Sequence, residues 1–217
     1  MKKILLILFL VNCLWCFGQK PVIYSRERIE IDSLLVTPPL SRIYVINKMS
    51  KMAIDEELSR ETFNAANQLI KRQFQGSINA TYLLPDSATQ AKLNTFITTV
   101  CTKISNERQA SKYIIPDSIM NLFGSANNGF VFCLATEGFK RGRENLVRTQ
   151  TTSEVADFLI GYNFRPLESS SLMIGFILDL NQRQIHHFEK NTWPNNDPTD
   201  LDVLRLQINR MLTHCLN

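Results

Sequence analysis

The sequence has little of what most catalytic and metal sites are built from. Its 217 residues include only three histidines and five cysteines, and they contain no Gly-x-Ser-x-Gly or His-Glu-x-x-His motif. Histidine is a common general base and zinc ligand, so its scarcity leaves hydrolase and metal chemistry few residues to use. The linear motifs therefore predict no catalytic, metal-binding or cofactor-binding residue.

A strong charge excess and a low-complexity linker are also missing. The chain carries 24 Lys and Arg against 20 Asp and Glu, and without Lys2 and Lys3 the basic residues number 22. So small an excess does not predict nucleic-acid binding. No Gly/Ser-rich or Pro-rich stretch divides the chain, so residues 19–217 are predicted to form one α/β domain.

No long apolar run occurs after residue 18. The run from Ile4 to Phe17 follows Lys2 and Lys3 and leads to Gly18, which completes a small-x-small tripeptide. A membrane-spanning helix needs about 20 apolar residues. We therefore predict that residues 1–18 are a cleaved signal peptide. The mature chain is expected to be exported, periplasmic or secreted, and to lack a transmembrane segment.

A lipid anchor is the competing interpretation of the N-terminus. Leu10-Val11-Asn12-Cys13 has the hydrophobic half of a lipobox, but Asn12 stands where a small Gly, Ala or Ser is expected. Cleavage after Gly18 is therefore favoured over lipidation.

Three cysteines, Cys101, Cys133 and Cys215, follow the predicted cleavage point. All three lie in apolar segments, where a free cysteine behaves as a small buried hydrophobe. A disulfide framework is not predicted. An oxidising compartment permits one bridge plus an odd thiol, and the sequence leaves the pairing open.

Helical spacing of apolar residues marks several segments. Residues 55–75 have this spacing, Asp86 is placed to cap a second helix, and a short helix is predicted from Pro116 to Phe123. A further helix is expected over residues 153–160. Thr199 and Asp202 form a capping-box pattern before the last helix. The apolar stripe of that helix is Leu201, Leu204, Ile208, Met211, Leu212 and Cys215.

Runs typical of strands lie between these helices. They are residues 34–36, 42–46, 77–84, 130–135, 172–180 and 184–190. The last two are joined by a short turn and predict an antiparallel hairpin. We therefore predict an α/β fold with a mixed sheet of about five to six strands, a C-terminal β-hairpin and about three to four flanking amphipathic helices.

Residues 137–144 are predicted to form a charged, glycine-containing loop. Lys140, Arg141 and Arg143, with Arg148 nearby, make it the strongest local charge cluster. Such a loop could bind acidic lipid, polysaccharide or a protein partner, although a solvated surface loop is favoured because no aromatic residues are interleaved.

Three Asp-Ser-aliphatic triplets place Ser33, Ser87 and Ser118 in a pattern that resembles the O-glycosylation acceptor of exported Bacteroidota proteins. Helix capping explains Ser87 and Ser118 equally well.

The histidines give no clear site. His186 and His187 are adjacent in a predicted strand, so they are expected on opposite faces, one of them facing solvent. His214 neighbours Cys215, but Cys215 lies on the apolar stripe, which favours packing over a nucleophilic role.

Several short motifs occur along the chain in a characteristic order. They are Gly18-Gln19, the 34–36 strand, Asp55–Ser59, Ile115–Ser118, Glu137–Phe139, Ile177–Asp179 and Asp197-Pro198. This arrangement resembles that of uncharacterised exported Bacteroidota proteins. The predicted topology is also similar to that of envelope lipoproteins of the CsgG and LpoB type. That second resemblance implies an α/β domain without an active site that assembles with or activates other envelope proteins.

The function favoured by these observations is a non-enzymatic binding or assembly accessory for an envelope protein or glycan. The alternative is a periplasmic hydrolase acting on a cell-wall or glycan substrate, with a site assembled from Glu137, Asp179, His186 and Glu189. A small-ligand binding module would instead require an apolar cavity with few polar groups. The oligomeric state is left open.

Overall fold

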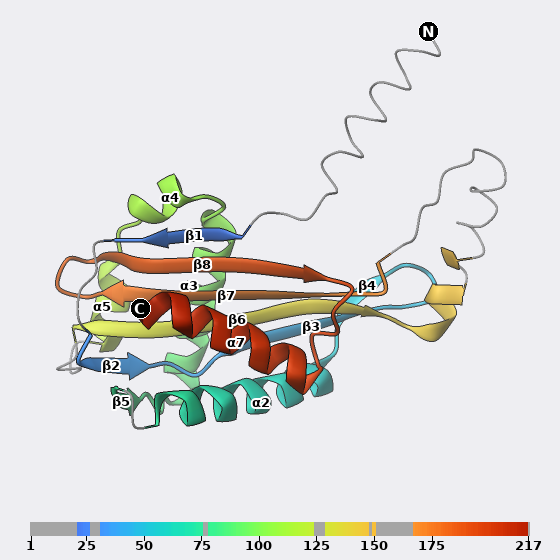
Figure 1. The fold of residues 1–217 in the computed structure, drawn as a ribbon, viewed down its shortest axis with the longest axis horizontal. Helices are drawn as coiled ribbons and strands as arrows, with labels where there is room; N and C mark the ends of the chain where they lie inside the picture. The colour runs from blue at the N-terminus through green and yellow to red at the C-terminus, as the bar shows by residue number, and fades with distance from the viewer. Residues whose placement is uncertain are drawn as a thin grey trace, which may run out of the picture.

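The computed structural model describes residues 21–26, 31–75, 78–123, 129–147, 149–150 and 167–216. An eight-stranded mixed sheet lies between two layers of helices (Figure 1). This confirms the predicted α/β class, with more strands than expected. The predicted signal peptide and the predicted helix at 153–160 lie outside the described residues. Among the helices that are described, none is both long and apolar enough to span a membrane.

Three long antiparallel strands, β6, β7 and β8, form the middle of the sheet. The strand order across the sheet is β1-β8-β7-β6-β2-β5, and β3 pairs with β6 and with β4. The predicted hairpin is confirmed as β7 and β8, and its strands extend further than expected. The strands are β1 (Val22–Ser25), β2 (Ser33–Val36), β3 (Leu40–Ile46), β4 (Met52–Ile54), β5 (Asn79–Tyr82), β6 (Phe130–Arg141), β7 (Ser169–Asp179) and β8 (Gln184–Pro194).

Strand β6 has two successive parallel neighbours along one edge. Leu35 of β2 pairs with Val131, and Leu40 of β3 pairs with Ala135. The Pro38-Pro39 pair separates β2 from β3 because proline cannot donate a hydrogen bond within a ladder. The sheet therefore has one end built around β2 and β5 and another built around β3 and β4.

Helices cover the two faces separately. Helices α3, α4 and α5 lie on the face that we call the first face, and α2 and α7 lie on the second. The helices are α2 (Glu56–Phe74), α3 (Ser87–Lys103), α4 (Glu107–Ser111), α5 (Asp117–Phe123) and α7 (Leu201–Leu216).

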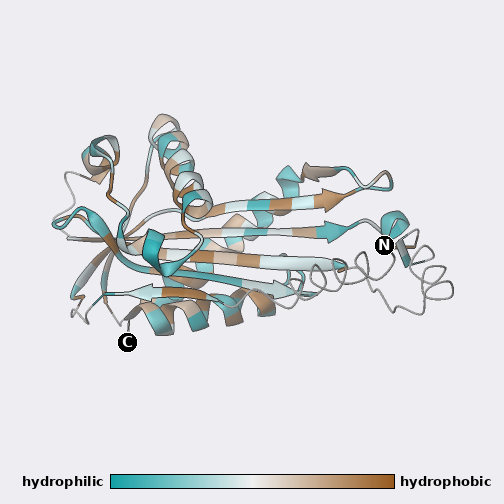
Figure 2. Ribbon diagram, turned by 90° about the horizontal axis from the view of Figure 1, so that it is seen from above, coloured by the Kyte–Doolittle hydropathy of each residue, from teal (hydrophilic) through white to brown (hydrophobic). Residues whose placement is uncertain are grey.

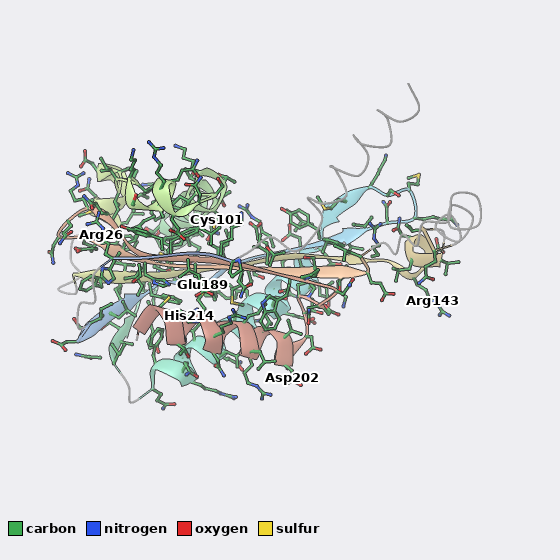
Figure 3. All side chains as sticks on the ribbon, turned by 45° about the horizontal axis from the view of Figure 1, so that its top comes forward. Arg26, Cys101, Arg143, Glu189, Asp202 and His214 are labelled. Carbon is green, nitrogen blue, oxygen red and sulfur yellow. The ribbon has the colours of Figure 1, made fainter. Side chains whose placement is uncertain are left out.

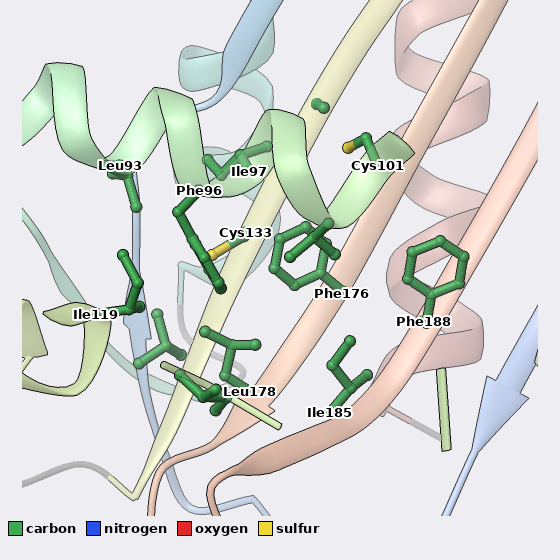
Figure 4. Close-up of a cluster of buried hydrophobic side chains, with 14 of the residues drawn as sticks. Leu93, Phe96, Ile97, Cys101, Ile119, Cys133, Phe176, Leu178, Ile185 and Phe188 are labelled. Atoms are coloured by element: carbon green, nitrogen blue, oxygen red, sulfur yellow. The ribbon is translucent and has the colours of Figure 1, made fainter. Parts of the chain in front are cut away.

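The core of the first face is aromatic and aliphatic (Figure 4). Leu93, Ile97 and Val100 of α3 are fully buried, as their spacing predicted. The Phe96 ring meets Phe176 edge to face at 6.2 Å, and Phe176 stacks on Phe188 at 6.5 Å. These contacts join α3 to β7 and β8.

Helix α7 supplies five of the buried residues of the second core, and α2 and the strands supply the others. The five from α7 are Leu204, Ile208, Met211, Leu212 and Cys215, whereas Leu201, predicted on the same stripe, is 62% exposed. Leu201 is exposed because the helix only begins there. A Cβ atom at Gly175 of β7 would collide with the Met211 side chain, so glycine allows α7 to lie directly on the sheet.

The predicted cap of α7 was wrong by one residue. Oδ1 of Asp200 accepts a hydrogen bond from the Asp202 amide at 2.8 Å, so Asp200 is the N-cap residue of the helix. The Thr199 hydroxyl instead donates to Asp197 at 2.7 Å.

The cap of α2 gives a first testable prediction. Oδ1 of Asp55 accepts the Leu58 amide at 3.0 Å. Asp55→Ala leaves that amide without its partner and should lower the free energy of unfolding by about 1 kcal/mol, whereas Asp55→Ser should retain most of it. Urea unfolding of both variants checks this. Equal losses in the two variants would show that the cap is not the cause.

Candidate functional site

The helices of the first face cover only one end of the sheet. Strands β3, β4 and β6 and the adjoining ends of β7 and β8 extend well beyond α3, α4 and α5 (Figures 1 and 2). We use the name platform for the first-face surface of these strands that none of the described helices covers. A shallow depression of about 290 Å³ lies on it. Its lining residues are Tyr44, Met52, Glu137, Gly138, Phe139, Ser170, Leu172, Lys190 and Thr192.

The register of four strands brings the platform side chains together. Tyr44 pairs with Phe139, Phe139 with Ser170, and Glu137 with Leu172. Side chains directly opposite one another on neighbouring strands project to the same face and lie close together. The platform is therefore a surface formed by β3, β4, β6, β7 and β8, and not by one loop.

The platform and its edge strand carry exposed apolar side chains. Met52 is 60% exposed and Ile54 is 46% exposed. Both belong to β4, where Ile54 pairs with Tyr44 of the platform. Phe139 and Leu172 are partly buried beside them. Clustered exposed apolar residues of this kind are typical of protein interaction sites.

The charges around the platform are mainly positive. Glu137, the one carboxylate among the described residues that line the depression, lies 3.9 Å from Nη1 of Arg42, whose Nη2 donates to Thr98 of α3 at 2.6 Å. Lys190 lines the depression, and the Arg141 guanidinium lies 6.0 Å from the centre of the Phe139 ring. The platform therefore has an apolar centre and a basic rim.

The predicted basic loop is partly a strand. Strand β6 continues to Arg141 because β3 and β7 pair with it on both sides, and Lys140 pairs with Val45 and Ser169. The Lys140 ammonium lies 2.7 Å from Asp197 on the second face. Arg143 is exposed, and Arg148 lies outside the described residues. Of the four predicted residues, Arg141 alone is shown to border the platform.

The ion pair with Lys140 helps to lower the pKa of the Asp197 carboxyl group. Burial favours a higher pKa for Asp197, but the hydrogen bonds from Lys140 and from Thr199 outweigh burial and hold its pKa below the usual value. Lys140 thus has a structural partner, which reduces its availability for a ligand.

A second polar cluster lies on the second face, next to α7. The prediction that His186 and His187 point to opposite faces, one of them to solvent, was wrong: both are buried, and both contact residues of the second face, His187 opposite Ile177 and His186 against Phe130. Ile177 pairs with His187 but Leu178 pairs with Ile185, so His186 is an extra residue in the ladder. The His186 ring meets Phe130 edge to face at 5.4 Å. Nothing in the sequence alternation marks this bulge.

Burial keeps His187 neutral. Desolvation, assisted by the neighbouring His186 and His214, lowers its pKa to about 4. Neither of its ring nitrogens has a hydrogen-bond partner among the described residues.

Glu189 and His214 form the one paired site of this cluster (Figure 3). Oε2 of Glu189 lies 3.0 Å from Nδ1 of His214, and Oε1 has no partner within the described part of the chain. The Glu189 side chain is fully buried, whereas that of His214 is 37% exposed. The pair connects the C-terminal end of α7 to β8.

The three cysteines after residue 18 are free and buried. Burial, with a contribution from the Glu189 charge, raises the pKa of Cys215 well above its usual value, and burial raises the pKa values of Cys101 and Cys133 to about 12. A thiol in such surroundings does not form the reactive thiolate. The structure therefore gives Cys215 a packing role beside His214.

The four residues of the hydrolase alternative do not converge on one site. Glu137 faces the platform, whereas Glu189 lies on the opposite face next to α7. Asp179 ends β7, where its Oδ1 accepts the Gln182 amide at 3.0 Å in the hairpin turn. In the described ranges, no group of three or more His, Cys, Asp or Glu residues is arranged to hold a metal ion.

The Glu189–His214 pair gives a second prediction. His214→Leu leaves the buried Glu189 oxygen without a donor and should lower the free energy of unfolding by about 1–3 kcal/mol. The double change Glu189→Leu with His214→Leu should restore most of that loss, because no polar group is then stranded. Chemical denaturation at pH 7 checks this. Additive losses would contradict the coupling.

The predicted glycosylation positions lie on different parts of the surface. Ser87 is the first residue of α3 and Ser118 the second of α5, and both are exposed, while Ser33 begins β2 and is partly buried. Modification at these serines stays a prediction.

No protein-family model and no curated protein sequence matches the chain. Several solved structures have a similar fold. The PelC dodecamer from Paraburkholderia phytofirmans is 8% identical with a TM-score of 0.40, over 90% of this chain and 96% of that one. Lipoprotein GNA1162 from Neisseria meningitidis is 10% identical with a TM-score of 0.33, over 86% and 97%.

The C-terminal domain of LpoB from Salmonella enterica is 6% identical with a TM-score of 0.33, over 77% of this chain and 86% of that one. The similar structures thus include one described as a lipoprotein, GNA1162, and the C-terminal domain of LpoB. At these identities and TM-scores, the similarity gives no basis for transferring a partner or an activity to this chain.

Proposed function

We propose that this chain is an exported, non-enzymatic binding or assembly accessory, and that its platform docks a protein partner of the cell envelope. The observation that carries the proposal is the end of the sheet that the described helices of the first face leave open, where exposed Met52 and Ile54 adjoin Tyr44 and Phe139. The envelope location follows from the signal peptide predicted at residues 1–18.

The side-chain types of the platform favour a protein partner. Aromatic residues and methionine are enriched at the cores of protein interfaces, and methionine adapts its shape to the opposing surface. When a partner covers the apolar side chains of the platform, each Å² of apolar surface removed from water would contribute roughly 25 cal/mol to the free energy of binding.

The rim charges indicate a partner with acidic groups. Glu137 is neutralised by Arg42, so Lys190 and Arg141 dominate the field around the apolar centre. A two-fold contact between two copies of this face would oppose the same cations. A heterologous protein with an apolar patch and an acidic rim satisfies both features.

Site-specific photocrosslinking tests the proposal. Benzoylphenylalanine is introduced at position 52 on the edge of the platform or, as the control, at position 206 on α7, where Leu206 is 56% exposed. In the natural host, illumination should give an adduct with a different protein from position 52 and not from position 206. Ile54→Glu should weaken adduct formation at least about tenfold, and Leu206→Glu should not.

Three results would overturn the proposal. They are an adduct made of two copies of this chain, the same adducts from both positions, or no adduct from position 52. Circular dichroism of Ile54→Glu must match the unmodified protein, since Ile54 is surface exposed and the change should leave the fold intact.

A further inference from the structure

A groove between α3 and α5 lies on the first face, at the end of the sheet opposite the platform. Its volume is about 450 Å³, within the range of about 300–1,000 Å³ that is usual for small-molecule sites. Its lining residues are Ala91, Lys92, Thr95, Phe96, Thr99, Lys103, Tyr113, Pro116, Ser118 and Ile119.

The floor of the groove is apolar. Phe96 and Ile119 form part of the buried core, and Tyr113 packs against that core. The hydroxyl protons of the two threonines in the wall are already donated, from Thr95 to the Ala91 carbonyl at 2.9 Å and from Thr99 to the Thr95 carbonyl at 2.8 Å, so neither is free for a ligand carboxylate. The wall therefore offers a ligand few unsatisfied polar groups.

The groove has a lysine toward each end. Lys92 and Lys103 are eleven residues apart on α3, which places them on the same side of the helix and about 16 Å apart along its axis. Asp86 lies close enough to Lys92 to interact with it electrostatically. Lys103 has no ion-pair or hydrogen-bond partner within the described residues and is exposed.

We propose that this groove binds a single-chain anionic amphiphile of the fatty-acid class. Its alkyl chain lies over Phe96 and Ile119, and its carboxylate pairs with Lys103. The apolar floor matches the alkyl chain of such a molecule, and the ammonium of Lys103, which is unpaired among the described residues, matches its carboxylate. The site differs from the platform in position and in the kind of ligand.

Calorimetric titration of the mature protein with dodecanoate, below its micelle concentration, tests this site. Dodecyltrimethylammonium, which has the same chain and the opposite charge, is the matched ligand. Dodecanoate should bind more tightly than about 1 mM and at least about tenfold more tightly than the cation. Lys103→Glu should abolish that preference, and Thr99→Trp should block the groove and remove binding.

Lys71→Glu, on α2 of the opposite face, is the control for charge alone and should leave dodecanoate binding unchanged. Ile54→Glu should also leave it unchanged, which separates this site from the platform. The proposal fails if dodecanoate does not bind, if the two ligands bind equally, or if Thr99→Trp binds dodecanoate as well as the unmodified protein does.

Discussion

Phe176→Ala should lower the free energy of unfolding by about 3–5 kcal/mol, the usual loss when a buried phenylalanine is truncated. Phe176 is completely buried in the middle of the sheet. Its ring contacts Phe96 of α3 on one side and Phe188 of β8 on the other, at centroid distances of 6.2 and 6.5 Å.

Phe139→Ala is the matched comparison, because Phe139 is also a strand phenylalanine of the first face but lies partly exposed on the platform. It should lose far less stability. Guanidinium unfolding of both variants measures the difference. Equal losses would mean that the platform belongs to the stabilising core and is not a free surface.

Protonation of His187 by itself should decrease the free energy of unfolding by up to about 3 kcal/mol as the pH falls from about 6.5 to about 4. Burial lowers the pKa of His187 in the folded protein to about 4, whereas it is about 6.5 in an unfolded chain. Between these values the unfolded chain takes up a proton that the folded protein excludes. The stabilisation is complete above pH 6.5 and is lost as the pH falls.

His187→Met should remove this slope, since methionine fills a similar space without titrating. Burial also lowers the pKa of His186, an effect that Asp179 opposes, so a smaller slope should remain in the variant. Denaturant titrations between pH 4 and pH 7.5 measure both proteins. An unchanged slope in His187→Met would contradict the buried, neutral histidine.

The regular elements could be predicted because their local patterns agree with their surroundings. The α3 stripe from Leu93 to Ile104, the apolar start of β6 and the β7–β8 hairpin follow directly from spacing and turn signals. The second half of β6 could not be predicted, because its charged and glycine-containing residues are held in a strand by pairing with β3 and β7. Leu40 of β3 and its partner Ala135 are 95 positions apart in the sequence, and Lys140 and its partner Ser169 of β7 are 29 apart.

The platform was missed for a related reason. Tyr44 was placed in a strand, but its exposure depends on α3 ending before it reaches that part of the sheet. β4 has only three residues, all exposed, and follows Ser50, which has a positive φ of 60°. The bulge at His186 likewise depends on pairing with β7 and has no signature in the local sequence.

The affinity of the crosslinked partner for three forms of the chain tests the central claim most directly. Biolayer interferometry should show binding to the Ile54→Glu variant weakened at least about tenfold, and binding to Leu206→Glu within about twofold of the unmodified chain. Raising the salt concentration should slow association, because Lys190 and Arg141 attract an acidic rim. Unchanged affinity in Ile54→Glu would contradict the platform as the docking surface.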